Sequence, residues 1–150
     1  MEKQSYIEFF NDLQKLVKGK IPIEKIKYSD GCCYCYIETG IENVHFQWHF
    51  DENESVLKIC FHFEGNEAKK NKLFFDITQY FKYVIEEDTG EEVKNEEKYE
   101  RNCSWYGIYI KRKYCELDEE LKKWAVEKMN IFYHTINEEI KKVIKTLEKF

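Results

Sequence analysis

The segment Val-His-Phe-Gln-Trp-His-Phe at residues 44–50 alternates strictly between apolar and polar side chains. Because successive side chains of a strand point to opposite faces of a sheet, this alternation predicts a strand with one buried face. Residues 32–38 and 56–64 are also predicted to be strands, and the short polar links 39–43 and 51–55 join them to the first. Links of this length are typical of hairpins, so the three segments predict an antiparallel meander.

A helix is predicted on the N-terminal side of these strands. Apolar residues recur at threes and fours over residues 5–18, which is the spacing of one helix face. Ser5 and Glu8 form an S-x-x-E capping box, in which each side chain accepts a hydrogen bond from an amide of the first turn. Gly19 can take the left-handed conformation that often follows a helix. Residues 20–31 are expected to be a connector.

Two further helices are predicted from caps and apolar spacing. One extends from about residue 67 to 88, between a cap at Asn66 and a stop at Gly90. The other begins after Asp118 and, with about 30 residues, would span roughly 45 Å. Such a length predicts either a break near residues 135–137 or a C-terminal end that protrudes and pairs with another subunit.

The remaining segments complete the expected fold. Residues 104–112 alternate again and predict a fourth strand, whereas residues 91–103 are dominated by Glu, Lys and Asn and are expected to be an exposed loop. The element order is therefore α-β-β-β-α-β-α. We expect a single α+β domain, residues 1–150, with a four-stranded antiparallel sheet and helices packed on one face.

Composition and charge restrict the function classes. With 43% hydrophobic and 35% charged residues, the chain is expected to fold as a globule. A net charge of −5 and the presence of only two arginines, Arg101 and Arg112, disfavour nucleic acid as a partner. No segment is long and apolar enough to predict a membrane span. The N-terminus does not resemble a signal peptide, so we expect a cytoplasmic protein whose six cysteines are reduced.

The strand pattern also predicts what each face of the sheet carries. One face is apolar, with Cys33, Cys35, Ile37, Val44, Phe46, Trp48, Phe50, Leu57, Ile59, Phe61, Phe63, Tyr106, Ile108 and Ile110. The other face is expected to carry Tyr34, Tyr36, His45, Gln47, His49, Lys58, Cys60, His62, Trp105, Tyr109 and Lys111. This second face combines aromatic rings with three of the four histidines, unlike either a plain core or a plain solvent face.

One interpretation of the second face is a binding surface. Aromatic rings can pack against a protein partner or stack on bases, and lysines can meet phosphates. Two plainer interpretations stay open: a helix or second subunit covers the face, or Tyr and His line a half-exposed sheet, where Tyr is common for packing reasons. The candidate binding residues are Tyr34, Tyr36, His45, His49, Lys58, His62, Trp105, Tyr109 and Lys111.

Metal binding is a third class. Cys32 and Cys35 have the C-x-x-C spacing of a zinc knuckle, and Cys60 and His62 could add two ligands. Within a strand, however, Cys32 and Cys35 point to opposite faces and cannot hold one ion together. A buried cysteine is more often a small apolar filler. We therefore expect no metal site and no cofactor.

Thiol catalysis depends on the strand register. If Phe50 pairs with Leu57, His45 lies directly opposite His62. Cys60 could then lie near His45 or His62. A thiol beside a positioned base is the arrangement that nucleophilic catalysis requires. Cys and His inside strands more often have a structural role, so we expect that the protein is not an enzyme. A metal- or thiol-dependent enzyme stays open as an alternative.

Three stretches resemble a known family. They are Leu57-Lys58-Ile59-Cys60-Phe61-His62-Phe63, Asn71-Lys72-Leu73-Phe74-Phe75-Asp76, and Ile85-Glu86 with Gly90-Glu91-Glu92-Val93. The later family pattern is matched by Ile108-Tyr109-Ile110, Leu117-Asp118, Trp124 and Phe132-Tyr133. Over residues 44–150 the chain resembles the domain of unknown function 4268 family, which is often found at the C-terminal end of restriction-endonuclease-like and other prokaryotic defence-linked proteins. The chain lacks the tryptophan that the family pattern places soon after Glu92.

The resemblance implies an accessory module in a prokaryote, tied to defence or DNA-processing proteins, and it carries over no catalytic residue. Together with the residue patterns, it leads us to expect a cytoplasmic interaction module. Such a module would bind a protein partner or itself through the aromatic and histidine face or the C-terminal helix. A nucleic-acid-associated accessory domain is the alternative.

Overall fold

The computed structural model describes residues 2–29, 32–65, 68–100 and 103–147. In these ranges the elements are α1 (Lys3–Leu16), β1 (Ile23–Ser29), β2 (Cys32–Glu38), β3 (Val44–Asp51), β4 (Val56–Gly65), α2 (Ala68–Thr89), β5 (Lys94–Glu100), β6 (Cys103–Lys113) and α3 (Glu119–Leu147). The strands form one antiparallel sheet in the order β1-β2-β3-β4-β6-β5. The α+β class and the antiparallel sheet are confirmed, but the sheet has six strands rather than four.

Both missed strands lie at the edges of the sheet. β1 falls in the predicted connector 20–31, and β5 falls in the predicted loop 91–103. In β1, a bulge between Ile23 and Lys25 shifts the register, so that Ile23 and Ile26 share a face although they are three residues apart. β5 consists almost entirely of Lys, Glu and Asn. Edge strands are commonly charged, which prevents sheets from pairing edge to edge, so apolar alternation does not reveal them.

The N-terminal helix starts earlier than its capping pattern indicates. α1 begins at Lys3, and Glu2 occupies the N-cap without a side-chain hydrogen bond. The amide of Ser5 donates to the carbonyl of Glu2 (3.0 Å), so Ser5 lies inside the first turn and the predicted capping box with Glu8 is wrong. Gly19 does adopt the left-handed conformation (φ 81°), two residues beyond the C-cap Val17.

The last two helices follow the sequence pattern more closely. α2 ends at Thr89 and is followed by Gly90 in the left-handed conformation (φ 71°), as predicted, whereas the cap predicted at Asn66 lies outside the described residues. α3 is continuous through residues 135–137, so the predicted break is wrong. Ile136 and Ile140 are buried there, which keeps the apolar stripe of the helix against the core without interruption.

The start of α3 depends on Asp118. Its carboxylate Oδ1 accepts a hydrogen bond from the amide of Leu121 (2.9 Å) at the first turn. Asp118→Ala is therefore expected to lower the free energy of unfolding by about 1 kcal/mol. Asp118→Asn keeps the acceptor and should retain most of that stability. Urea unfolding followed by circular dichroism measures both, and an equal loss in the two variants would contradict a capping role.

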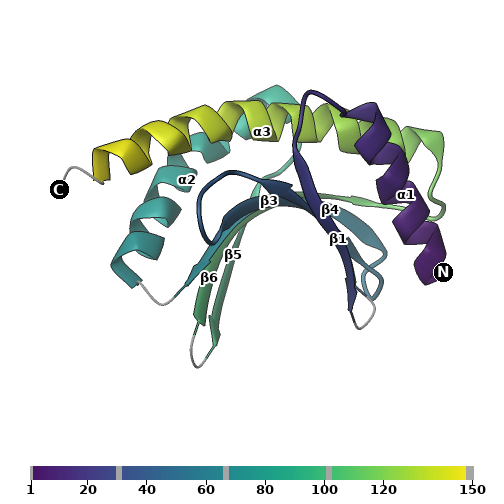
Figure 1. Ribbon diagram of the computed structural model, residues 1–150, viewed down its shortest axis with the longest axis horizontal. Coiled ribbons are helices and arrows are strands. Elements are labelled where there is room, and N and C mark those ends of the chain that lie inside the picture. The colour runs from purple at the N-terminus through teal and green to yellow at the C-terminus, as the bar shows by residue number, and fades with distance from the viewer. Residues whose placement is uncertain (1, 30–31, 66–67, 101–102, 148–150) are drawn as a thin grey trace.

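The helices lie on one face of the sheet. Figure 1 shows α3 running along the outer side of an arched sheet, with α1 and α2 on the same side. The apolar residues predicted for this face are buried, apart from the partly buried Tyr106. Trp48 at the centre of β3 is fully buried and donates its indole N–H to the carbonyl of Ala125 in α3 (3.1 Å). The helices therefore cover the outer side of the arched sheet, and the inner, concave side is the second face of the sheet.

Candidate functional site

The concave face is the sheet face opposite the helices, and it carries Tyr34, Tyr36, His45, His49, His62 and Tyr109 with the residues between them. The register considered above is the one observed, because Phe50 pairs with Leu57 and His45 pairs with His62. Cross-strand partners share a face, and Lys58 pairs with Lys111. Eight of the nine predicted binding residues therefore lie on this face, whereas the side chain of the ninth, Trp105, lies outside the described part of the structure.

No helix of the described residues lies across the concave face (Figure 1), so the interpretation that the chain's own helices cover it is wrong. Its centre is nevertheless buried, with Gln47 exposed by 5%, His62 by 7% and Cys60 by 1%. A concave surface brings its side chains together, so that neighbours shield one another from water. The outer candidates, such as Tyr36 and Tyr109, are half-buried.

The aromatic rings of the concave face form a continuous row across β2, β3 and β4. Tyr34 stacks on His49 with ring centroids 4.3 Å apart, and it lies 5.9 Å from Tyr36. Tyr36 contacts His45 edge to face at 5.0 Å, and His45 contacts His62 in the same way at 3.8 Å. Edge-to-face and stacked pairs of this kind fix ring orientation, so the row presents a preorganised surface.

A glycine makes room for this row on β6. Gly107 lies opposite His62, and a Cβ placed on it would lie 2.5 Å from the carbonyl oxygen of Phe61 and 2.8 Å from the Cβ of His62. No side chain fits at such distances. Glycine inside a strand is typical of a close backbone approach, and here it lets β4 and β6 approach each other beneath the histidines.

Burial keeps two of the histidines neutral. Removal from water and the nearby ammonium of Lys25 lower the pKa of His45 from 6.5 to about 4. Removal from water, followed by the influence of His45 and His49, places the pKa of His62 well below 6.5. Both imidazoles are therefore uncharged at neutral pH.

This burial predicts acid sensitivity of the fold. The unfolded chain binds protons at His45 and His62 near pH 6.5, whereas the folded chain binds them only at lower pH. Stability is thus complete above about pH 6.5 and is lost as the pH falls toward 4, by up to about 1.4 kcal/mol per pH unit for each histidine. His62→Gln should flatten this slope in urea titrations, because glutamine binds no proton in this pH range. An unchanged slope in His62→Gln would contradict the assignment.

Three thiols of the sheet, those of Cys33, Cys35 and Cys60, are buried and protonated. Burial raises the pKa of Cys35 to about 12 and that of Cys33 to about 11. Burial also raises the pKa of the Cys60 thiol strongly, and the effect of Lys58 and a hydrogen bond from Gln47 only partly offset it. Reactive cysteines have a lowered pKa and partial exposure, so these thiols are poor nucleophiles. Among the described residues no group of three or more His, Cys, Asp or Glu side chains is arranged to hold a metal ion.

The two lysines predicted to contact a ligand already face carboxylates. The ammonium of Lys58 lies 3.9 Å from Asp51 and 4.9 Å from the centre of the Tyr109 ring. The ammonium of Lys111 lies 3.8 Å from Glu54. These neighbours reduce the positive potential of this end of the concave face.

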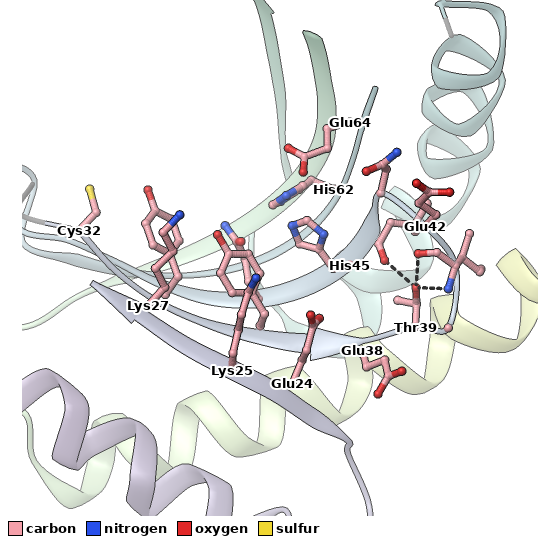
Figure 2. A pocket seen from close by; sticks show the side chains of 17 residues that line it. Glu24, Lys25, Lys27, Cys32, Glu38, Thr39, Glu42, His45, His62 and Glu64 are labelled. Carbon is pink, nitrogen blue, oxygen red and sulfur yellow. Dashed lines mark hydrogen bonds between the residues drawn. The ribbon is translucent and has the colours of Figure 1, made fainter. Parts of the chain in front are cut away.

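A hollow of about 890 Å³ opens on the concave face between β1, β2, β3, β4 and the link 39–43. Its walls include Tyr34 and Tyr36, and His45, Gln47 and His62 line it from β3 and β4. Figure 2 shows both imidazoles at its centre. The volume lies within the range of sites that enclose small molecules or a few side chains. The concave face therefore has room for a ligand.

The comparisons with known proteins add a family relationship. The family model described as a domain of unknown function (DUF4268) matches residues 5–140. The chain belongs to the DUF4268 family. No curated protein and no solved structure matches the chain.

The DUF4268 match includes the whole sheet and most of α3, and it starts well before residue 44, where the sequence resemblance begins. The concave face and its hollow are thus part of the family domain. The family description carries no activity, so membership does not choose among the function classes. Within the described residues, no helix of this DUF4268 chain is long and apolar enough to cross a membrane.

The sequence interpretation missed the β1 wall of the hollow. Lys25 and Lys27 pair with Tyr36 and Tyr34, so they lie on the concave face, and the ammonium of Lys25 lies 5.3 Å from the centre of the Tyr36 ring. The only available signal is that both lysines alternate with Ile26. Once residues 20–31 are assigned to a connector, that alternation carries no information about a face.

Proposed function

We propose that this DUF4268 chain is a non-enzymatic binding module that holds a segment of a partner protein on its concave face. The observation that carries the proposal is the hollow of about 890 Å³, lined by a preorganised row of aromatic rings and left open by the described helices. Tyrosine rings provide large contact areas with few rotatable bonds, which is why they are enriched where proteins bind one another.

Charge favours a protein segment over nucleic acid. Among the described residues, the hollow is lined by four glutamates, Glu24, Glu38, Glu42 and Glu64, and by two lysines, both from β1. A phosphate backbone requires an excess of positive charge, and its binding grows from the release of counterions. Because Lys58 and Lys111 also face carboxylates, the concave face offers little attraction to phosphates.

The non-enzymatic part of the proposal rests on the chemistry of the side chains in the hollow. A thiol enzyme requires a thiolate near neutral pH, and burial raises the pKa of Cys60 instead. The imidazoles of His45 and His62, on the same face of the sheet, contact each other edge to face. This arrangement favours a structural role for the three side chains.

The test removes two rings from the concave face. Tyr36→Ala combined with Tyr109→Ala deletes two aromatic anchors that are half-buried. We expect the double variant to lose affinity for its partner by at least about tenfold, because aromatic anchors dominate binding energy. The measurement is affinity capture from cells of the source organism with wild-type and variant chains, followed by titration of the captured protein.

Two exposed tyrosines of α2 provide the matched control. Tyr80→Ala combined with Tyr83→Ala removes the same groups, which are exposed by 73% and 75%, from the helical side of the molecule. A protein that binds wild type and this control, but not the concave-face variant, supports the proposal. A protein that all three chains bind equally contradicts it. Sedimentation of the wild-type chain identifies a second copy as the occupant if the chain self-associates and the Tyr36/Tyr109 variant does not.

A further inference from the structure

The two edges of the sheet are built differently. At one edge, β5 places Asn95 and Glu97 on the helical side of the sheet, and both side chains are exposed. At the other edge, β1 places Ile23, Ile26 and Tyr28 on the helical side, where they are partly buried against the core. The apolar layer of the sheet therefore extends to the β1 edge, whereas polar and charged side chains protect the β5 edge.

The backbone of β1 is paired along one edge. β1 pairs with β2 in regular antiparallel register from Lys25 to Ser29. Its other edge, which we call the outer edge, pairs with no strand of the described residues. The last strand of a sheet presents a row of backbone donors and acceptors, to which an extended segment can add as a further strand. The outer edge of β1 is therefore a place where a protein segment can pair.

The side chains along the outer edge are positively charged. Lys25 and Lys27 lie on the concave side, two residues apart, and both are exposed. Near the end of the strand, the ammonium of Lys3 lies 5.2 Å from the centre of the Tyr28 ring. The one carboxylate of β1, that of Glu24, lies in the bulge at the start of the strand. The regular part of β1 thus carries two lysines and no carboxylate.

These lysines disfavour a second copy of this chain as the added strand. If two β1 edges paired in antiparallel fashion about Ile26, Lys25 of each copy would lie opposite Lys27 of the other. Like charges directly opposite each other are destabilising. A strand with carboxylates at a spacing of two residues would turn the same positions into ion pairs. The ammonium of Lys25, 5.3 Å from the centre of the Tyr36 ring, is exposed and can meet a carboxylate there.

We propose that the outer edge of β1 binds an extended protein segment of alternating acidic and apolar residues, which adds to the six-stranded sheet as a further strand. The acidic side chains lie on the concave side beside Lys25 and Lys27, and the apolar side chains lie beside Ile26 and Tyr28. Backbone hydrogen bonds provide the affinity, and the alternating side chains select the sequence. The inference goes beyond the proposed function, because the segment pairs with an edge and does not require the aromatic row.

The probe is a capped peptide, Ser-Val-Glu-Val-Glu-Val-Ser, titrated into the full chain at low salt and followed by amide chemical shifts and hydrogen exchange. We expect saturable shifts in β1 and slower exchange of its amides, with a dissociation constant below about 1 mM. The same peptide with lysine at both glutamate positions should not bind. Absence of saturable shifts with the glutamate peptide, or shifts centred on an element other than β1, overturns the inference.

Two exposed lysines allow the charge preference to be tested without endangering the fold. Lys25→Gln with Lys27→Gln should weaken binding of the glutamate peptide about fivefold, because it removes two exposed ion pairs. Lys141→Gln with Lys145→Gln makes the same change of net charge at exposed positions of α3 and should change binding less than twofold. Equal weakening by both pairs of substitutions would reduce the effect to net charge and refute the site.

The backbone pairing is tested on the peptide. Proline in place of the central valine keeps both carboxylates but removes a backbone donor and disfavours pairing as a strand. We expect the proline peptide to bind at least about tenfold more weakly and to leave hydrogen exchange in β1 unchanged. If the proline and valine peptides bind equally well, the peptide is held by charge alone and the addition of a strand is wrong.

Discussion

Replacing Trp48 with alanine is expected to lower the free energy of unfolding by about 4 kcal/mol. Trp48 is fully buried in β3, and its indole N–H donates to the carbonyl of Ala125 in α3 (3.1 Å). Removal of a buried aromatic side chain costs about 3–5 kcal/mol, because the lost contacts are not recovered around the cavity. Natural domains are stable by only about 5–15 kcal/mol, so the variant should be close to unfolding.

Guanidinium unfolding followed by circular dichroism measures this loss. Trp48→Phe keeps most of the apolar volume and removes the indole hydrogen bond, so it should cost clearly less than alanine. Tyr83→Ala, which removes an exposed aromatic ring from α2, should change the free energy of unfolding by less than about 0.5 kcal/mol. A loss below about 1 kcal/mol in Trp48→Ala would show that β3 and α3 do not depend on this contact.

The second large effect is expected at Gly107. Gly107→Ala places a Cβ 2.5 Å from the backbone carbonyl oxygen of Phe61, which cannot move without disturbing β4. We expect a loss of about 3 kcal/mol, at the upper end of the cost of overpacking, and a larger loss for Gly107→Val. The same displacement should change the chemical shifts of His62, which lies opposite on β4.

Gly40→Ala is the control for glycine replacement as such. Gly40 has a positive φ of 76°, but no atom lies within 4 Å of the Cβ that alanine would add. Gly40→Ala should lower the free energy of unfolding by about 1 kcal/mol, which is the cost of placing alanine in the left-handed backbone conformation. Equal losses at Gly40 and Gly107 would mean that the close approach of β4 and β6 is not the cause.

The central sheet was predictable because the residues of β3 alternate between apolar and polar side chains. The pattern around Trp48 assigned each side chain to the correct face, and the short link between β3 and β4 made the antiparallel pairing of these strands predictable. Both inferences use only the two-residue period of a strand. The same period fails at the edges, where the bulge before Lys25 breaks it in β1 and charged residues hide it in β5.

The candidate site was predictable only in part, for a related reason. The pairing of His45 with His62 follows from register, whereas the hollow requires a curved sheet and a β1 wall. Curvature depends on contacts between residues that are distant in sequence, such as Gly107 against His62. The carboxylate of Glu42 joins the site through the conformation of a link, which no periodic pattern specifies.

The strand order has a consequence for how the chain assembles during synthesis. β4 pairs with β6 and not with β5, so residues 56–65 find their second partner only after residues 103–113 have been made. Until then β4 presents an unpaired edge that carries Ile59, Phe61 and Phe63, the kind of edge that recruits strands from other chains. A nascent or truncated chain that ends after α2 is therefore the aggregation-prone species, and completion of β6 is the step that protects it.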